Sequence, residues 1–170
     1  YLYWAREPSR PGGRGLLFIH GGGAHSYWWS YIAPYFTRDF RVAAIDLSGM
    51  GDSAWRGHYN SELRAEEIRA VIAAAQLGER PFVIGHSFGG WTALASPDVV
   101  HEIRAVVALA PAGSSNPRPG ILPAKLAFGW GRDVPTLVLV ADNDVCLPID
   151  GMYEIFERIP AAKRMVVLRR

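Results

Sequence analysis

The sequence has 170 residues and a mass of 18.7 kDa, which is the size of a single domain with a sizeable core. Its 49% hydrophobic and 20% charged residues argue against a disordered chain or a coiled coil, and a net charge of +2 without a basic cluster predicts no nucleic-acid partner. No apolar run exceeds six residues, whereas a membrane span needs roughly 20, so we expect no span and a cytoplasmic location. A lone cysteine, Cys146, excludes an internal disulfide and a multi-cysteine metal site.

Short apolar runs rich in β-branched residues recur along the chain and predict strands. In chain order they are Leu16–Ile19, Val42–Ile45, Pro81–Ile84, Ala105–Leu109, Thr136–Val140 and Met165–Leu168, with Leu2–Trp4 as an earlier fragment. Most are apolar at successive positions, which is typical of strands covered on both faces.

Three stretches between these runs have apolar residues at helical spacing. They are the segment Tyr27–Phe36, the segment around Ile68–Ala75 and the segment Met152–Ile159. For the second helix, Asn60 or Ser61 is a candidate N-cap and Gly78 a candidate C-terminal residue, and Pro160 ends the third.

Strands that alternate with helices predict an α/β fold, a mostly parallel sheet with helices on both faces, because parallel neighbours need crossover connections. We expect one domain over residues 1–170. The proline-rich and glycine-rich segment 114–134 interrupts the alternation, and we interpret it as a short lid or loop insertion.

The strand Pro81–Ile84 leads into Gly85-His86-Ser87-Phe88-Gly89-Gly90 and then into a segment of good helical propensity, Trp91–Ala95. A Gly-x-Ser-x-Gly pattern between a strand and a helix predicts a nucleophile elbow, with Ser87 in strained geometry and glycines where the backbones are too close for a Cβ. The alternative is an ordinary strand-to-helix turn with an exposed serine.

The strand Leu16–Ile19 leads into His20-Gly21-Gly22-Gly23-Ala24. A serine that attacks a carbonyl generates an oxyanion, which needs two backbone N–H donors. We expect one donor from Gly22 or Gly23 and the other from Phe88, the residue after the nucleophile. The same glycines could instead serve only to start the next helix close to the sheet.

Two carboxylates, Asp142 and Asp144, follow the strand Thr136–Val140 at the same sheet edge. An acid there would hold a histidine in the correct tautomer, and we favour Asp144 for this role over Asp142. Aspartates after strands are also common turn formers, so the pattern by itself leaves both interpretations open.

These motifs, together with Asp46–Ser53 after the second long strand, resemble the α/β-hydrolase family in order and spacing from about Leu16 onward. The resemblance implies that Ser87 is the nucleophile, Asp144 the acid, and Gly22 with Phe88 the oxyanion hole. It also implies that Asp46 and Ser53 shape the loop after their strand, and that His20 and His86 have packing roles.

In this family the base is a histidine that follows the acid and one further strand. None of the five histidines comes after Asp144, and we expect a chain cut from a longer one, with a reduced lid and without the last strand–helix portion. His25 and His58 lie on loops at the correct sheet edge and are the candidate substitutes, whereas His101 is expected at the opposite edge. We interpret Cys146 as a small buried apolar residue.

The sequence therefore predicts a serine-dependent hydrolase of carboxylic esters or related acyl bonds, inactive as a fragment if it lacks its histidine. One alternative is a carbon–carbon bond hydrolase of ring-fission products, which the segment Ala24–Trp28 resembles. Another is a non-catalytic, hydrolase-like protein that binds a small apolar ligand. We expect His25, Trp28 and Trp91 to line the pocket for an apolar, ester-like molecule, with no cofactor or metal.

Overall fold

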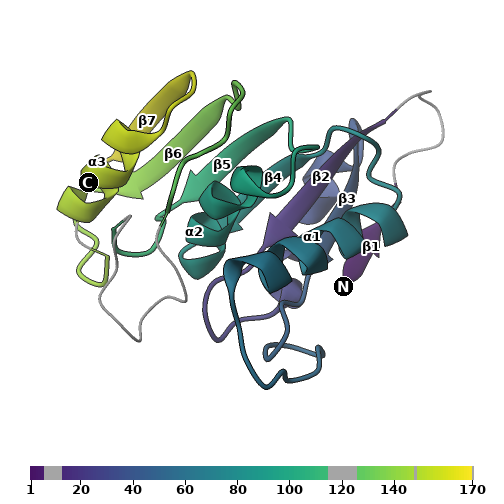
Figure 1. Ribbon diagram of the computed structural model, residues 1–170. Helices are drawn as coiled ribbons and strands as arrows, with labels where there is room; N and C mark the ends of the chain where they lie inside the picture. Colours follow the sequence, from purple (N-terminus) through teal and green to yellow (C-terminus); the bar gives the residue numbers. More distant parts are fainter. Residues whose placement is uncertain (6–12, 115–125, 148, 170) are drawn as a thin grey trace.

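The computed structural model describes residues 1–5, 13–114, 126–147 and 149–169. Its centre is a seven-stranded sheet in the order β1-β3-β2-β4-β5-β6-β7, in which only β1 is antiparallel to its neighbour (Figure 1). The strands are β1 (Leu2–Trp4), β2 (Arg14–Ile19), β3 (Phe40–Ile45), β4 (Phe82–His86), β5 (Ala105–Leu109), β6 (Thr136–Ala141) and β7 (Lys163–Leu168). All six predicted strands and the earlier fragment are confirmed.

In the described part of the chain, the sheet carries three α-helices and three short 3-10 helices. The α-helices are α1 (Ser61–Ala74), α2 (Phe88–Ala95) and α3 (Ile149–Arg158), and the 3-10 helices are η1 (Ser26–Trp29), η2 (Ala33–Phe36) and η3 (Ser96–Asp98). The side chain of Asn60 caps α1 by accepting a hydrogen bond from the N–H of Leu63. Of the three helices expected from helical spacing, the second and third are confirmed as α1 and α3.

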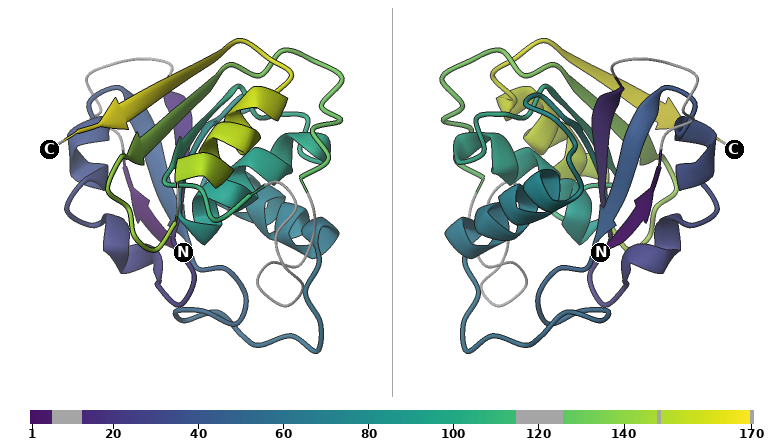
Figure 2. Two further views of the ribbon diagram at one scale, coloured as in Figure 1. Left: turned by 90° about the vertical axis from the view of Figure 1, so that its left-hand side faces the viewer. Right: turned by 90° about the vertical axis from the view of Figure 1, so that its right-hand side faces the viewer.

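All three α-helices lie on one face of the sheet (Figure 2). Their buried side chains join those of the strands in a large core cluster that includes Ile68, Leu94 and Ile155. The opposite face carries η1 and η2 over β2 and β3, where Trp29 stacks on Phe18 with ring centroids 4.6 Å apart. The expected α/β fold is therefore confirmed, but helical cover on the second face is confined to one end of the sheet.

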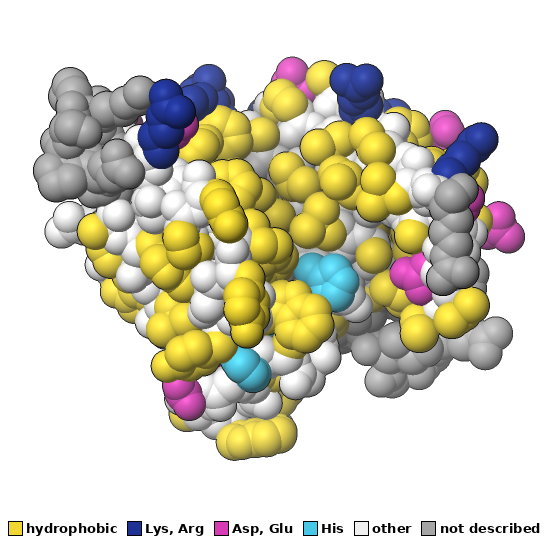
Figure 3. Space-filling model, turned by 180° about the vertical axis from the view of Figure 1, so that it is seen from behind, with side chains coloured by type: hydrophobic (Ala, Val, Ile, Leu, Met, Phe, Trp, Pro, Cys, Tyr) yellow, Lys and Arg dark blue, Asp and Glu magenta, His cyan; other side chains and the backbone are white. Residues whose placement is uncertain are grey.

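Beyond η1 and η2, the second face is apolar (Figure 3). Side chains at alternating strand positions there, such as Ile84, Leu109 and Leu139, are only half-buried, whereas Val83, Ala108 and Val138 on the α-helical face are fully buried. The two faces of the same strands thus differ in how far they are covered.

Two local predictions are wrong. The segment Tyr27–Phe36 is not one amphipathic helix, because Pro34 lacks an N–H and its ring blocks a continuous helix, so the segment splits into η1 and η2. Gly78 does not end α1. The left-handed residue that closes the helix is Gln76, with φ of 50°, and the Leu77 N–H bonds back to the Ile72 carbonyl at 3.0 Å as in a Schellman motif. Gly78 is also left-handed, with φ of 83°, but it lies beyond this motif.

The segment 114–134, expected as a lid or loop insertion, lies partly outside the described residues. Its described second part runs into the core, where Leu126, Phe128, Trp130 and Val134 are buried. These residues therefore anchor the segment to the α-helical side of the sheet.

Candidate active site

Ser87 lies on the sharp turn between β4 and α2, at the carboxyl edge of the parallel strands. Its backbone has φ of 53° and ψ of −116°, a conformation that side-chain-bearing residues rarely adopt. Strain of this kind, at the point where open α/β sheets bind their ligands, indicates a functional position.

Close backbone packing holds the turn in this conformation. A Cβ on Gly85 would lie 2.0 Å from the carbonyl oxygen of Gly89, and one on Gly89 would lie 2.3 Å from that of Ile19. The Ser87 N–H donates to the Leu109 carbonyl at 2.9 Å, and the Ser87 carbonyl accepts from Ala112 at 3.1 Å. Both glycines are therefore required by sterics, as the motif predicts.

The glycine turn after β2 lies directly beside Ser87. The Cβ position of Gly21 is 3.5 Å from the Ser87 Cβ, and that of Gly22 is 3.6 Å from the Phe88 Cβ. Phe88 is the first residue of α2, so its N–H has no acceptor within the helix. The structure thus brings Gly22 and Phe88 together, while Gly23, with φ of 70°, shapes the turn next to them.

A cleft of about 340 Å³ opens between the glycine turn and the elbow. Its lining residues are Gly21–Ala24, His25, Trp28, His86 and Ser87. Trp28 stacks on His86 with ring centroids 5.9 Å apart, which makes an aromatic wall beside the nucleophile candidate. Trp91, which we expected at the pocket, does not line this cleft: it is 2% exposed and packs in the core.

The two carboxylates after β6 lie on an exposed loop at the same edge. Asp144 is half-buried, and its Oδ1 accepts hydrogen bonds from the N–H groups of Cys146 and Leu147, both at 2.9 Å. Asp142 is exposed. Cys146 is exposed as well, so the expectation of a buried residue there is wrong, because the residue lies on this surface loop. Burial lowers the pKa of His86, whereas the negative charge of Asp144 acts in the opposite direction, so this carboxylate is within electrostatic reach of the cleft.

The five histidines divide clearly by position. His25 and His86 line the cleft, whereas His58 and His101 are exposed and lie away from it. His20 is fully buried, with Nδ1 2.7 Å from the Gly21 carbonyl and Nε2 accepting from the Leu47 N–H at 3.2 Å. These partners fix the neutral tautomer, and burial lowers the pKa of His20. His20 thus has the packing role that the resemblance implies.

Asp46 and Ser53 shape the loop after β3, as expected. The two carboxylate oxygens of Asp46 accept from the N–H and the hydroxyl of Ser26 at 2.7 and 2.9 Å. The Ser53 hydroxyl donates to the Asp46 carbonyl at 2.6 Å. These bonds tie the loop after β3 to the start of η1, next to the cleft.

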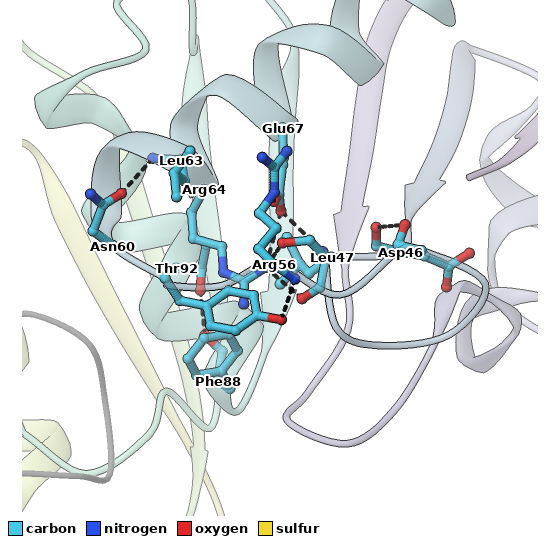
Figure 4. A network of polar contacts seen from close by, with 12 residues as sticks. Asp46, Leu47, Arg56, Asn60, Leu63, Arg64, Glu67, Phe88 and Thr92 are labelled. Atoms are coloured by element: carbon cyan, nitrogen blue, oxygen red, sulfur yellow. Dashed lines mark hydrogen bonds and ion pairs between the residues drawn. The ribbon is translucent and has the colours of Figure 1, made fainter.

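Sequence reasoning missed a partly buried ionic network beside the elbow (Figure 4). Glu67 accepts from Arg64 at 3.0 Å, from Arg56 at 3.0 Å and from the Ser48 N–H at 3.1 Å. Burial raises the pKa of Glu67, but the bonds from Ser48 and Arg64 outweigh it and hold the pKa below its usual value. The sequence does contain one sign of this network. Arg64 lies on the same face of α1 as Ile68, Val71 and Ile72, which are buried.

Among the described residues, no helix is long and apolar enough to cross a membrane. The same part of the chain contains no group of three or more His, Cys, Asp and Glu residues able to hold a metal ion.

Residues 16–167 match the profile of the Alpha/beta hydrolase family. The chain belongs to this family. A pimeloyl-[acyl-carrier protein] methyl ester esterase from Sodalis glossinidius is 31% identical over 141 residues, which are 78% of this chain and 50% of that protein. A 2-hydroxy-6-oxo-6-(2'-aminophenyl)hexa-2,4-dienoic acid hydrolase from Metapseudomonas resinovorans is 31% identical over 107 residues, 60% of this chain and 38% of that protein.

Among solved structures, the monoacylglycerol lipase of Paleococcus ferrophilus superposes with a TM-score of 0.73 at 23% identity, over 93% of this chain and 86% of that one. This likeness confirms the α/β-hydrolase fold. The matched part of this α/β-hydrolase chain covers between 30% and 63% of the first curated relatives' own lengths. Three of these curated relatives are named as esterases.

Proposed function

We propose that Ser87 is the nucleophile of a serine-dependent ester hydrolase that works through an acyl-enzyme. The observation that supports this most directly is the strained backbone of Ser87, held between Gly85 and Gly89 and facing the cleft. The Ser87 Oγ would attack the substrate carbonyl, the alcohol would leave, and water would then hydrolyse the acyl-enzyme.

The oxyanion of each tetrahedral intermediate would be held by the N–H groups of Phe88 and Gly22, with Gly23 as the second choice on the turn. The contact between the Gly22 and Phe88 Cβ positions supports this pairing. Donors that are fixed before the reaction stabilise the oxyanion without rearrangement, which is why a rigid turn suits the role.

Asp144 is the proposed acid, supported by its electrostatic reach to the cleft. In the family order the base follows the acid, and no histidine follows Asp144 in these 170 residues. We propose that this base comes from outside the 170 residues, because His20 has both ring nitrogens engaged and, among the described residues, no hydrogen bond joins His25 or His86 to Ser87.

The proposed substrate is a small ester with an apolar acyl or alcohol portion. Its apolar part would lie against Trp28 and its polar part near His25, since both line the cleft beside Ser87. The esterase relative, named for a methyl ester, supports this choice of bond.

A carbon–carbon bond hydrolase is the second candidate. The relative named as a 2-hydroxy-6-oxo-6-(2'-aminophenyl)hexa-2,4-dienoic acid hydrolase supports it, as does the position of Ala24, His25 and Trp28 on the cleft wall. A protein that only binds an apolar ligand is the alternative outside the enzymes.

The experiment is covalent labelling with a fluorophosphonate probe, with and without added imidazole to replace an absent base. We expect labelling of the wild type with imidazole, no labelling of Ser87→Ala, and full labelling of Ser30→Ala, a partly exposed serine on the neighbouring segment. Equal labelling of Ser87→Ala and wild type would refute the nucleophile. Turnover of a p-nitrophenyl ester, but not of a vinylogous diketone, separates the first candidate from the second.

A further inference from the structure

Arg64 is the only cation among the described residues that is classed as buried, with a relative exposure of 6%. Its Nη1 donates to the Ser48 carbonyl at 3.0 Å, to the Ser48 hydroxyl at 3.1 Å and to Glu67 at 3.0 Å. A buried charge needs such partners, because an unpaired one is strongly destabilising. These bonds explain how Arg64 is tolerated, but they do not involve the elbow.

The guanidinium of Arg64 also meets two aromatic rings. It lies 4.8 Å from the ring centroid of Tyr59 and 5.9 Å from that of Phe88. Figure 4 shows Arg64 extending from α1 toward the loop that carries Arg56 and toward Phe88 at the start of α2. One side chain therefore joins the loop after β3, helix α1 and the residue next to the nucleophile candidate.

Phe88 also lies close to the glycine turn and is bonded within α2. Its Cβ lies 3.6 Å from the Cβ position of Gly22, and its carbonyl accepts from the Thr92 hydroxyl at 2.9 Å. Phe88, at the start of α2, thus neighbours both the Arg64 guanidinium and the glycine turn. The Phe88 N–H is at that start.

We propose that Arg64 is a positioning residue of the oxyanion hole, which acts by holding the ring of Phe88 so that the Phe88 N–H stays aligned with that of Gly22. This inference rests on the proposed function. Because oxyanion donors act mainly in the transition state, misalignment lowers kcat and leaves KM nearly unchanged.

A double-mutant cycle tests whether Arg64 acts through Phe88. The variants are Arg64→Met, Phe88→Leu, which keeps the backbone N–H, and the double variant, assayed for labelling rate with imidazole present. We expect each single change to lower the rate about tenfold, and the double variant to be no slower than about twofold below the slower single one. A double variant slowed by the product of the single effects overturns the proposal.

Arg104→Met is the matched control. Arg104 lies 5.5 Å from the ring centroid of Phe82, so the change removes the same type of Arg–Phe contact at the opposite end of β4 from Ser87. We expect its labelling rate to stay within about twofold of the wild type. Should Arg64→Met fail to fold, Arg64→Lys takes its place, because an ammonium keeps the charge beside Glu67 but cannot stack as a planar group.

Hydrogen exchange gives a readout that needs no catalysis. We expect amide exchange in residues 87–91 to be at least about fivefold faster in Arg64→Met than in Arg104→Met, compared at equal global stability. If the wild type is not labelled, the proposed function fails while the exchange result still decides the positioning role. Unchanged exchange in residues 87–91 overturns the positioning role whatever the labelling shows.

Discussion

The elbow and the acid loop lie at the same edge of the sheet, yet the chain holds them in different ways. At the elbow, neighbouring backbones approach Gly85 and Gly89 so closely that no Cβ fits. In the acid loop, residues 141–147, Val145 is 92% exposed and the Asp144 carboxylate bonds only within its own turn among the interactions found in the described residues.

The fold as a whole therefore determines the geometry of the elbow, whereas a local turn determines the geometry of the acid loop. The conformation of Ser87 depends on three strands and two loops, so it should survive any change at Asp144. In the structure, the Asp144 carboxylate stabilises a turn. Of the two roles that an aspartate after a strand can have, turn former and catalytic acid, this is the simpler one. Substitutions in the two regions should therefore differ in whether they lower stability or reactivity.

Gly89→Ala is expected to have the largest effect on stability. Its Cβ would lie 2.3 and 2.4 Å from two backbone carbonyl oxygens, of Ile19 and His20, which cannot rotate away. We expect a loss of about 3 kcal/mol or more in the free energy of unfolding, measured by urea denaturation. Gly57→Ala, with no atom within 4 Å of its Cβ position, is the control and should be nearly neutral. A stable Gly89→Ala variant would remove the steric argument for the elbow.

Asp46→Ala tests the support behind the elbow. It leaves the buried N–H and hydroxyl of Ser26 without their acceptors, so we expect a loss of about 2 kcal/mol. Asp52→Ala, at an exposed position six residues along the same loop, should change stability by less than about 0.5 kcal/mol. Equal stabilities of the two variants would show that the Ser26–Asp46 bonds do not hold the loop.

Asp144→Asn and Asp144→Ala divide the two roles of the acid loop. Asparagine keeps an oxygen for the N–H groups of Cys146 and Leu147 but carries no charge, whereas alanine loses both. We expect a loss of about 1 kcal/mol for alanine and little change for asparagine in thermal unfolding. If Asp144 also orients the catalytic base, both variants should lose esterase activity. Retained activity in Asp144→Asn would leave the turn as its only role.

Much of the fold could be predicted because its signals are local. Runs such as Ala105–Leu109 are apolar at every position, and the glycines at 85 and 89 have a steric requirement that few other contexts share. The errors arose where tertiary packing or a single residue decided the outcome. Pro34 splits a segment with helical periodicity, Gln76 is the left-handed residue that closes α1 two positions before Gly78, and Trp91 is buried in the core instead of lining the cleft.

The site could be predicted as a set of motifs but not as an electrostatic network. Arg64 and Glu67 are three residues apart on one helix, a spacing common on solvent-exposed faces, so their burial followed only from the packing of α1 against the loop after β3. The Trp28–His86 stack joins residues 58 positions apart in the sequence and has no local signature.

Titration of His20 should have the smallest effect, and it would again set the elbow region apart from the acid loop. The pKa of His20 is lowered from 6.5 chiefly by burial, so the unfolded chain binds this proton more readily than the folded one. Stability from neutral His20 is therefore fully present above pH 6.5 and falls as the pH drops toward the folded pKa. Protonation would also take the lone pair of Nε2 from the Leu47 N–H.

We expect the slope of unfolding free energy against pH, measured between pH 7 and 5, to be shallower in His20→Gln than in the wild type. His86, whose pKa burial also lowers, leaves part of the slope in that variant. Identical slopes would mean that the glycine turn does not depend on the charge state of His20.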